Sequence, residues 1–257
     1  MRPRKIEERL KGLNSSGKKA VAWLIDPDKV KSTESLKNQI KEAIRLDLDF
    51  FFVGGSLIQE NSIDSIVGLI KSLTTEIPVV IFPGNVIQFS EKADGLLFLS
   101  LISGRNPEFL IGQHVTIAPL LMKTKVEILP TGYLLIDSGA PTSVQYISQT
   151  IPLPNTKPDL SVATAFAGHL LGLQYFYVDA GSGAKNPVSS KIIHALKKHI
   201  PAPLIVGGGL NSLPKVKEAF TSGADLVVIG NGAEKNPGFL TEVLEYIAVF
   251  NLSLNVN

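Results

Sequence analysis

Eight short apolar runs, separated by segments with helical spacing, constrain the fold of this chain more than any other feature of its sequence. Runs rich in β-branched and aromatic residues predict buried strands, and strands that alternate with helices form parallel βαβ units. The predicted strands span residues 20–25, 50–53, 79–82, 96–101, 133–136, 176–178, 204–206 and 226–229. Helical periodicity is clearest over residues 33–46, 62–73, 188–199 and 213–222.

Strands that are apolar throughout are covered on both faces, and eight of them in 257 residues favour a closed (β/α)₈ TIM barrel. We therefore expect one α/β domain spanning residues 1–257, with an open doubly wound sheet as the alternative. The connections before and after the fifth predicted strand are longer or less regular, and Pro119, Pro130, Pro152, Pro154 and Pro158 punctuate them. Such rim segments often carry specificity, although flexible surface loops would explain them equally well.

Composition narrows the classes of function. The 25 basic and 23 acidic residues leave a net charge of only +2, so there is no global electrostatic case for a nucleic-acid partner. The absence of cysteine excludes disulfides, thiolate metal sites and thiol nucleophiles, and fits a cytoplasmic protein. The apolar runs are much shorter than the roughly twenty residues that cross a bilayer, so contact with lipid would be a transient one at the membrane surface. The basic segment through Lys11 is interrupted by Glu7 and Glu8, which predicts a solvated first helix rather than a signal peptide.

Two predicted strands end abruptly in glycine and predict a phosphate site. Gly207, Gly208 and Gly209 follow one of them, and Gly230, Asn231 and Gly232 follow the other. Bare backbone at two strand exits can turn several amide N–H groups toward one anion. In a TIM barrel, the loops after strands seven and eight are frequent phosphate sites.

A carboxylate stands at the exit of the first predicted strand, where Asp26 would lie on the catalytic face of a barrel. Its oxygens could bind Mg²⁺, which often takes only one or two protein ligands and completes its shell with phosphate and water. The segment 26–28 would equally form a turn that caps the next helix. At the exit of the second strand, the hydroxyl of Ser56 could complete the metal site or cap a helix.

The sixth predicted strand brings a phenol and a carboxylate to one face. The two-residue repeat of a strand puts Tyr177 and Asp179 on the same side and Val178 on the other. A carboxylate in this place can accept hydrogen bonds from a polyol and take a proton from an attacking hydroxyl. The alternative is a core tyrosine and a surface aspartate joined to a flexible loop.

Other catalytic chemistries lack their residues at the predicted strand exits. The four histidines, His114, His169, His194 and His199, fall in segments predicted to be helical or peripheral, which argues against a histidine triad or metal cluster. The second halves of the predicted strands contain no lysine, which argues against a Schiff-base aldolase.

In their order along the chain, these segments resemble the geranylgeranylglyceryl phosphate synthase family, prenyltransferases that join a polyprenyl diphosphate to sn-glycerol 1-phosphate. Each segment is a weak signal alone, but the order is specific and covers most of the chain. The segments are Leu24–Lys29, Val53–Ser56, Ile81–Asn85, Leu129–Tyr133, Asp137–Gly139, Pro141–Val144, Tyr177–Ala184, Val206–Gly209 and Ile229–Asn231.

The resemblance implies a TIM barrel that depends on Mg²⁺, with the metal held at Asp26 and Ser56. It favours geranylgeranyl diphosphate as the prenyl donor, with another prenyl length as the alternative, and it favours a homo-oligomer. It also implies that glycerol 1-phosphate is bound by Tyr177, Val178, Asp179, Ala180, Gly181, Ser182, Gly183, Gly208, Gly209, Gly230 and Asn231.

Two positions depart from the family pattern. Leu24 replaces a lysine that some bacterial members carry, so other groups must neutralise the charge of the phosphate. Asp179 stands where many members have glutamate, so its side chain is one methylene shorter.

The implied chemistry assigns separate parts of the site to two phosphorylated substrates. Mg²⁺ would stabilise the diphosphate leaving group, Tyr177 would fix the glycerol, and Asp179 would deprotonate its C3 hydroxyl. The prenyl tail needs an apolar trough, for which Trp23, Phe50, Phe51, Phe52, Phe82, Phe89 and Phe98 are available. Two rival functions stay open: a phosphosugar isomerase-type barrel that uses Asp26 and Asp179 as acid and base, and a phosphate-binding barrel without catalysis.

Overall fold

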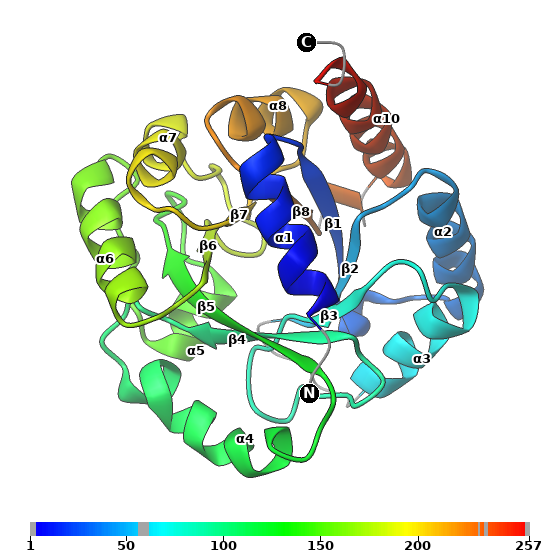
Figure 1. The fold of residues 1–257 in the computed structure, drawn as a ribbon, viewed down its shortest axis with the longest axis horizontal. Coiled ribbons are helices and arrows are strands. Elements are labelled where there is room, and N and C mark those ends of the chain that lie inside the picture. Colours follow the sequence, from blue (N-terminus) through cyan, green and yellow to red (C-terminus); the bar gives the residue numbers. More distant parts are fainter. Residues whose placement is uncertain (1–3, 56–61, 231, 234–235, 255–257) are drawn as a thin grey trace.

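The computed structural model describes residues 4–55, 62–230, 232–233 and 236–254. Its eight parallel strands close into a barrel in sequence order, because β1 pairs with β8 as well as with β2 (Figure 1). The TIM-barrel prediction is confirmed, and the open sheet is excluded. The strands are β1 (Ala20–Ile25), β2 (Phe50–Val53), β3 (Val79–Ile81), β4 (Gly95–Ser100), β5 (Glu127–Leu135), β6 (Tyr175–Asp179), β7 (Leu204–Gly207) and β8 (Leu226–Ile229).

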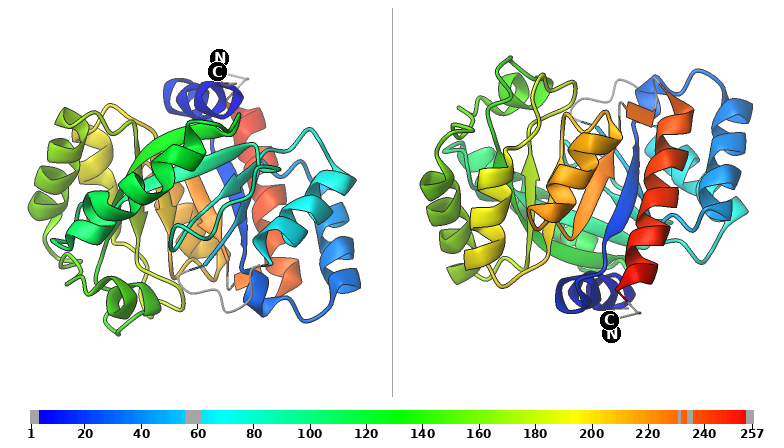
Figure 2. Two further views of the ribbon diagram at one scale, coloured as in Figure 1. Left: turned by 90° about the horizontal axis from the view of Figure 1, so that it is seen from below. Right: turned by 90° about the horizontal axis from the view of Figure 1, so that it is seen from above.

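Helices surround the barrel, and α1 (Lys5–Ser16) lies across one of its ends (Figures 1 and 2). The surrounding helices are α2 (Thr33–Arg45), α3 (Ile63–Leu73), α4 (Gln113–Leu121), α6 (Pro158–Leu170), α7 (Ser190–His199), α8 (Leu213–Thr221) and α10 (Pro237–Ser253). Short helical elements in the described connections include η1 (Pro27–Lys29), η2 (Glu108–Gly112) and α5 (Ser143–Ser148).

Successive residues of each strand alternate between two hydrophobic layers, as the pleat of a strand requires. In β2, Phe50 and Phe52 pack inside the barrel, whereas Phe51 packs between the sheet and the helices. In β6, Tyr177 joins the inner layer and Val178 the outer one. The predicted placement of Tyr177 and Val178 on opposite faces is therefore confirmed.

The first helix is present, but it is more than a solvated surface helix. Its side chains Ile6, Leu10 and Leu13 are buried against the inner layer of the barrel. The carboxylate of Glu127 accepts hydrogen bonds from the backbone N–H groups of Ile6, at 3.0 Å, and Glu7, at 2.7 Å. These bonds satisfy N–H groups that the first turn of a helix leaves unpaired, so Glu127 fixes the helix across the barrel end.

Strand β5 begins six residues earlier than predicted, at Glu127 instead of Tyr133. The sequence signal fails because Pro130, which the prediction placed in a connection, lies within the strand. Proline is tolerated there because the neighbouring strand β6 has not yet begun: the N–H of Gln174, one residue before β6, donates to the carbonyl of Pro130. On the other side, residues 127–132 of β5, which include Pro130, pair with β4.

Three aspartates fasten the amino-terminal end of the barrel. Asp49, Asp94 and Asp225 stand directly before β2, β4 and β8. Each accepts a hydrogen bond from a backbone N–H near the start of the preceding strand: Val21 at 2.9 Å, Val79 at 2.8 Å and Leu204 at 2.8 Å, respectively. Each also pairs with a basic side chain of a helix: Arg9 at 3.1 Å, Lys71 at 2.8 Å and Lys197 at 2.6 Å. Each carboxylate therefore joins two neighbouring strands and a helix, at the end opposite the glycine-rich exits.

Candidate active site

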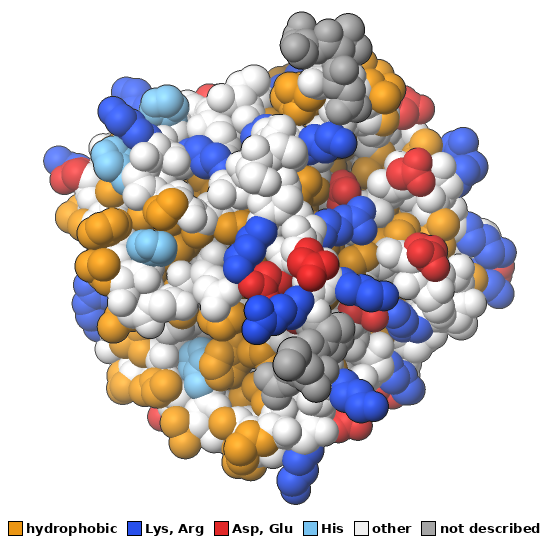
Figure 3. Space-filling view, in the orientation of Figure 1, with side chains coloured by type: hydrophobic (Ala, Val, Ile, Leu, Met, Phe, Trp, Pro, Cys, Tyr) orange, Lys and Arg blue, Asp and Glu red, His pale blue; other side chains and the backbone are white. Residues whose placement is uncertain are grey.

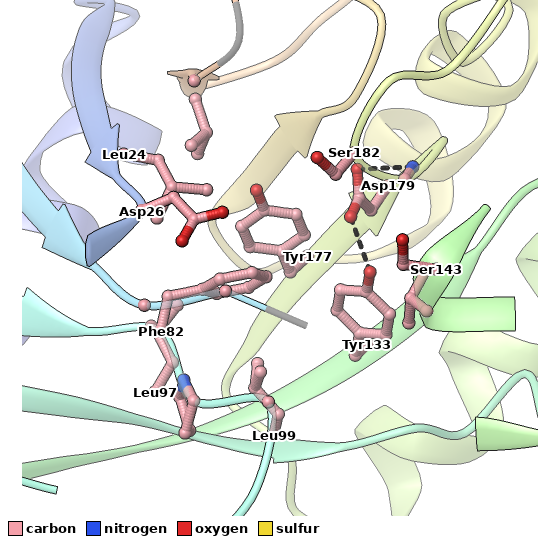
Figure 4. A pocket seen from close by; sticks show the side chains of 18 of the residues that line it. Leu24, Asp26, Phe82, Leu97, Leu99, Tyr133, Ser143, Tyr177, Asp179 and Ser182 are labelled. Carbon is pink, nitrogen blue, oxygen red and sulfur yellow. Dashed lines mark hydrogen bonds between the residues drawn. The ribbon is translucent and has the colours of Figure 1, made fainter. Parts of the chain in front are cut away.

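A cavity of about 510 Å³ lies at the carboxyl-terminal end of the barrel (Figure 4). Residues at the exits of β1, β6, β7 and β8 line it, among them Asp26, Asp179, Gly208 and Gly230. Barrel closure thus brings together side chains that are far apart in sequence. This end of the strands is where TIM-barrel enzymes carry their catalytic residues.

Asp179 is a buried carboxylate with both oxygens held in place. Its Oδ2 accepts a hydrogen bond of 2.6 Å from the hydroxyl of Tyr133, and its Oδ1 accepts one of 2.9 Å from the N–H of Gly181 (Figure 4). Burial raises the pKa of Asp179 above its ordinary value, although the hydrogen bonds from Tyr133 and Gly181 oppose the shift. The alternative of a surface aspartate on a flexible loop is wrong, and the group is suited to accept a proton.

Tyr133 is a site residue that the sequence prediction missed. In the sheet Tyr133 pairs with Tyr177 and Leu135 pairs with Asp179, so Tyr133 projects into the barrel beside the carboxylate. Burial, and then the neighbouring charge of Asp179, raise the pKa of Tyr133 well above its ordinary value, so the phenol stays protonated and donates its hydrogen bond. The predicted strand began at Tyr133, and no local signal in the sequence gives the register of β5 against β6 that places this residue beside Asp179.

Tyr177 lies at the centre of an aromatic cluster in the cavity. Its ring stacks on Phe82, with centroids 4.9 Å apart, and lies 5.5 Å from the ring of Tyr133. A Cβ atom at Gly207 would overlap the hydroxyl of Tyr177, so the glycine leaves room for the phenol. Burial raises the pKa of Tyr177 well above its ordinary value, and its hydroxyl therefore also stays protonated.

Asp26 caps a turn and also lies in the wall of the cavity. Its side chain accepts a hydrogen bond of 3.2 Å from the N–H of Asp28 and so caps the η1 turn. The same carboxylate lies in the cavity wall, and the ammonium nitrogen of Lys29 is 3.2 Å from its Oδ2. Capping the turn therefore orients the carboxylate toward the cavity.

The second predicted metal ligand, Ser56, lies outside the described residues. Within the described ranges there is no group of three or more His, Cys, Asp or Glu side chains that could hold a metal. The carboxylate of Asp26 in the cavity wall still suits Mg²⁺, which prefers oxygen and accepts phosphate and water as its remaining ligands.

The glycines at the strand exits differ in whether the fold has room for a side chain in their place. Gly208 has φ of +78°, and a Cβ atom there would lie 2.5 Å from Oδ1 of Asp179. Gly209 has φ of +71° and would place a Cβ 2.9 Å from the backbone nitrogen of Pro187. The fold itself therefore demands glycine at both positions, because the β7 exit packs on the loop after β6.

The fold does not require glycine at position 230, because the distance from a Cβ atom there to the nearest atom, on Leu24, would be 3.7 Å, an ordinary van der Waals contact. The next residue, Asn231, lies outside the described residues.

Only some of the predicted binding residues on β6 and in the loop after it have side chains that face the cavity. Gly181, Ser182 and Gly183 line it, together with Tyr177 and Asp179. The side chains of Val178 and Ala180 are buried in the outer hydrophobic layer, so these two predicted binding residues could reach a ligand only through their backbone. The alternation of the strand explains the difference.

The apolar part of the cavity is lined from β4, η2, α4 and α5. Leu97, Leu99, Phe109, Ile117 and Ile147 contribute to it. Of the seven aromatic residues proposed for a tail trough, Phe82 and Phe98 line the cavity. The other five, Trp23, Phe50, Phe51, Phe52 and Phe89, belong to the hydrophobic layers.

His114 is a second cavity residue that the sequence prediction did not identify: it lies in a helix, α4, as predicted, but it also lines the cavity. Its ring meets the ring of Phe98 edge-on, with centroids 4.4 Å apart. Burial lowers its pKa, so the imidazole is neutral. Its Nδ1 atom has no hydrogen-bond partner among the described residues.

Comparison with known proteins identifies the family. Residues 16–248 match the PcrB family. The chain belongs to that family. A geranylgeranylglyceryl phosphate synthase of Spirosoma linguale is 47% identical to this PcrB-family chain over 245 residues, which are 95% of this chain and 98% of the relative. A synthase of the same name from Chitinophaga pinensis is 43% identical over 94% of this chain and 93% of its own.

Solved structures agree with this family assignment. The (S)-3-O-geranylgeranylglyceryl phosphate synthase of Thermoplasma acidophilum, solved in complex with its substrate sn-glycerol-1-phosphate, superposes with a TM-score of 0.86 at 29% identity, over 96% of this chain and 98% of that one. Thiamine phosphate pyrophosphorylase of Pyrococcus furiosus, at 12% identity and a TM-score of 0.55 over 91% of this chain and 98% of its own, shares the fold alone. The resemblance read from the sequence is confirmed, and this PcrB-family chain is an enzyme of the prenyltransferase type.

No helix among the described residues combines the length and apolar character needed to cross a membrane.

Proposed function

We propose that the protein forms an ether bond between the C3 hydroxyl of sn-glycerol 1-phosphate and C1 of geranylgeranyl diphosphate, with release of diphosphate. The observation that carries the proposal is the division of one cavity into two unlike parts. A buried carboxylate stands among glycines in one part, and β4, η2 and α4 give the other an apolar wall. One small phosphorylated polyol and one long hydrocarbon tail match these two surfaces. The names of the relatives, and the glycerol phosphate bound to one of them, support the same pair of substrates.

The glycerol phosphate would occupy the glycine-lined part. Its phosphate would lie against Gly208, Gly209, Gly230 and Asn231, which leaves its C3 hydroxyl to reach Asp179. As the C3 oxygen bonds to the allylic carbon, the diphosphate leaves with the electron pair of the broken C–O bond, and the hydroxyl proton passes to the carboxylate of Asp179. The raised pKa of Asp179 favours that transfer.

The aromatic cluster would lie between the two substrates. The rings of Phe82, Tyr133 and Tyr177 have centroids 4.9 to 6.2 Å apart. Aromatic faces attract positive charge, such as the charge that develops on an allylic carbon as diphosphate departs. The hydroxyl of Tyr177 would orient the glycerol, and Tyr133 would hold Asp179.

Asp26 would hold Mg²⁺, with Ser56 as a second ligand. Its carboxylate oxygens and its place in the cavity wall suit the ion. When bound, the ion would neutralise charge on the diphosphate leaving group.

The reaction is tested by incubating the purified full-length chain with Mg²⁺, labelled sn-glycerol 1-phosphate and prenyl diphosphates of several lengths. We expect an extractable ether-lipid phosphate, formed with the highest kcat/KM from geranylgeranyl diphosphate. The enantiomer sn-glycerol 3-phosphate is the matched control substrate. Failure to form product with any prenyl length would overturn the proposal, and a clear preference for another length would select that alternative. An isomerase would leave the prenyl diphosphates intact.

We also propose that a second copy of the chain covers an exposed apolar face on α4 and α6. Val115, Phe166 and Leu170 are exposed on these helices and Met122 directly after α4, and Figure 3 shows hydrophobic side chains gathered over both helices. Neither α4 nor α6 contains a lysine or arginine, which an anionic membrane surface would attract. A two-fold interface sets a face against itself, so a face with little charge avoids self-repulsion.

Light scattering during gel filtration tests this assembly. The wild type should elute as a dimer or larger oligomer, and the double variant Phe166→Ser, Leu170→Ser should shift to monomer. Val249→Ser, which removes an exposed apolar side chain on α10, should leave the mass unchanged. A monomeric wild type would refute the proposal, and flotation of that monomer with lipid vesicles would assign the face to a membrane.

A further inference from the structure

The cavity is poor in positive charge for a site that would hold two phosphorylated substrates. Among the described residues that line it, Lys29 is the only lysine or arginine. Three carboxylates, those of Asp26, Asp28 and Asp179, line the same cavity. Lys29 is therefore the described side chain best able to add positive charge to a bound anion.

The η1 turn builds Lys29 into a pair with the predicted metal ligand. Asp26 caps the turn and Lys29 ends it, so the ammonium group lies 3.2 Å from Oδ2 of Asp26. The lysine side chain is 38% exposed, whereas that of Asp26 is 17% exposed. The turn thus fixes the carboxylate, and the longer lysine side chain is the more exposed member of the pair.

We propose that Lys29 has two successive roles, neutralising Asp26 while no metal is bound and then binding the diphosphate once Asp26 holds Mg²⁺. The inference rests on the proposed function, because it takes prenyl diphosphate as the ligand. A carboxylate paired with an ammonium group presents less negative charge to a divalent cation, so Lys29 competes with the metal. Mg²⁺ held by Asp26 would weaken this pair by repulsion, and the ammonium group of Lys29 would then bind an oxygen of the diphosphate.

Lysine suits this exchange of partners. Its ammonium is a compact charge with three rotatable donors on a flexible stem, so it can leave a carboxylate and bind phosphate without a fixed geometry. The diphosphate is preferred to the phosphate of glycerol 1-phosphate as its ligand because Lys29 lies beside the metal ligand Asp26, whereas the glycines assigned to the other phosphate follow β7 and β8.

The inference predicts effects of opposite sign in one variant. Lys29→Met keeps the apolar stem and removes the charge. By calorimetry it should bind Mg²⁺ alone up to about fivefold more tightly, since an exposed ion pair no longer competes. With Mg²⁺ present it should bind inorganic diphosphate about tenfold or more weakly, because a charged hydrogen bond is lost. Affinity for glycerol 1-phosphate should stay within about twofold of the wild-type value, well below the change expected from a lost charged contact.

Two further variants make the result specific. Lys31→Met removes an exposed lysine that does not line the cavity and should leave all three affinities unchanged. Lys29→Arg should restore diphosphate binding because the charge is kept. If the wild type binds Mg²⁺ and diphosphate and Lys29→Met binds both equally well, the inference is wrong while the proposed reaction stands. If Lys29→Met loses affinity for glycerol 1-phosphate instead of diphosphate, the inference is also wrong. A wild type that binds neither Mg²⁺ nor diphosphate would overturn both the inference and the proposed function.

Discussion

The hydroxyl of Tyr133 donates a hydrogen bond of 2.6 Å to Oδ2 of Asp179, and this bond joins the exits of β5 and β6 inside the barrel. Tyr133 stays protonated, so the bond stabilises the carboxylate form of Asp179 and opposes the effect of burial on its pKa. The pair therefore sets both the position and the basicity of the proposed base.

Tyr133→Phe should raise the pKa of Asp179, because the donor that favours its ionised form is lost. Since Asp179 must be ionised to accept a proton, the acidic limb of the kcat profile should move to higher pH, and kcat at neutral pH should fall about tenfold. Tyr175→Phe, which removes a buried hydroxyl on β6 outside the cavity lining, is the matched control. An unchanged profile would show that Tyr133 does not act through Asp179.

Asp179→Asn should lower kcat far more than it weakens binding of glycerol 1-phosphate, because the amide keeps the size of the side chain and loses the base. Steady-state kinetics and calorimetry separate the two effects. The opposite pattern would reassign Asp179 to substrate binding.

The same variant should show how the buried carboxylate affects stability. Because the folded-state pKa of Asp179 is raised, the contribution of this group to wild-type stability falls as pH rises from the unfolded-state pKa, near 4, through the folded-state value. Asparagine does not titrate. The difference in Tm between Asp179→Asn and the wild type should therefore become more positive as the pH is raised from about 4 toward neutrality, and a difference independent of pH would contradict the burial argument.

Asp26→Ala should abolish Mg²⁺-dependent turnover and leave the fold intact. The loss of its hydrogen bond to Asp28 should lower the free energy of unfolding by only about 1 kcal/mol, as for other caps. Glu34→Ala removes an exposed carboxylate from the first turn of α2 and should leave turnover unchanged. Turnover by Asp26→Ala equal to that of the wild type would remove Asp26 from the metal site.

Two glycine substitutions distinguish a glycine that the fold needs for stability from one that we expect a ligand to need for binding. Gly230→Ala fits the described structure, so it should leave Tm within a degree or so while raising KM for glycerol 1-phosphate, because the new methyl group would stand where the phosphate approaches. Gly208→Ala should lower the free energy of unfolding by more than about 1 kcal/mol, because its φ is positive and its Cβ would meet Asp179. Equal effects of the two substitutions on Tm and KM would contradict this distinction.

The sequence predicted the strands best where apolar runs end in residues with a clear physical meaning. The exits of β1, β7 and β8 are marked by Asp26, Gly208 and Gly230, and their predicted bounds agree with the structure to within one residue. The predicted start of β5 was wrong because the first half of this strand contains Glu127 and Pro130, residues with low β-strand propensity. Both are accommodated by tertiary contacts, with α1 and with the start of β6, that the sequence does not display.

The site was predictable to the extent that it follows from strand exits. Asp26, Tyr177 and Asp179 lie in the cavity as expected. The role of Tyr133 depends on register between strands, and that of His114 on how α4 packs against β4, so neither can be derived from local spacing. The assignment of Mg²⁺ to Asp26 and Ser56, and of the phosphate to Gly230 and Asn231, stays a prediction.

The three aspartates that precede β2, β4 and β8 have a practical consequence for altering this enzyme. Each anchors a strand pair and a helix at the end of the barrel remote from the cavity. Stabilising changes around these anchors can therefore offset destabilising changes at the mouth without touching a reacting group. Redesign of the apolar wall proposed to bind the prenyl tail could then begin from a more stable protein.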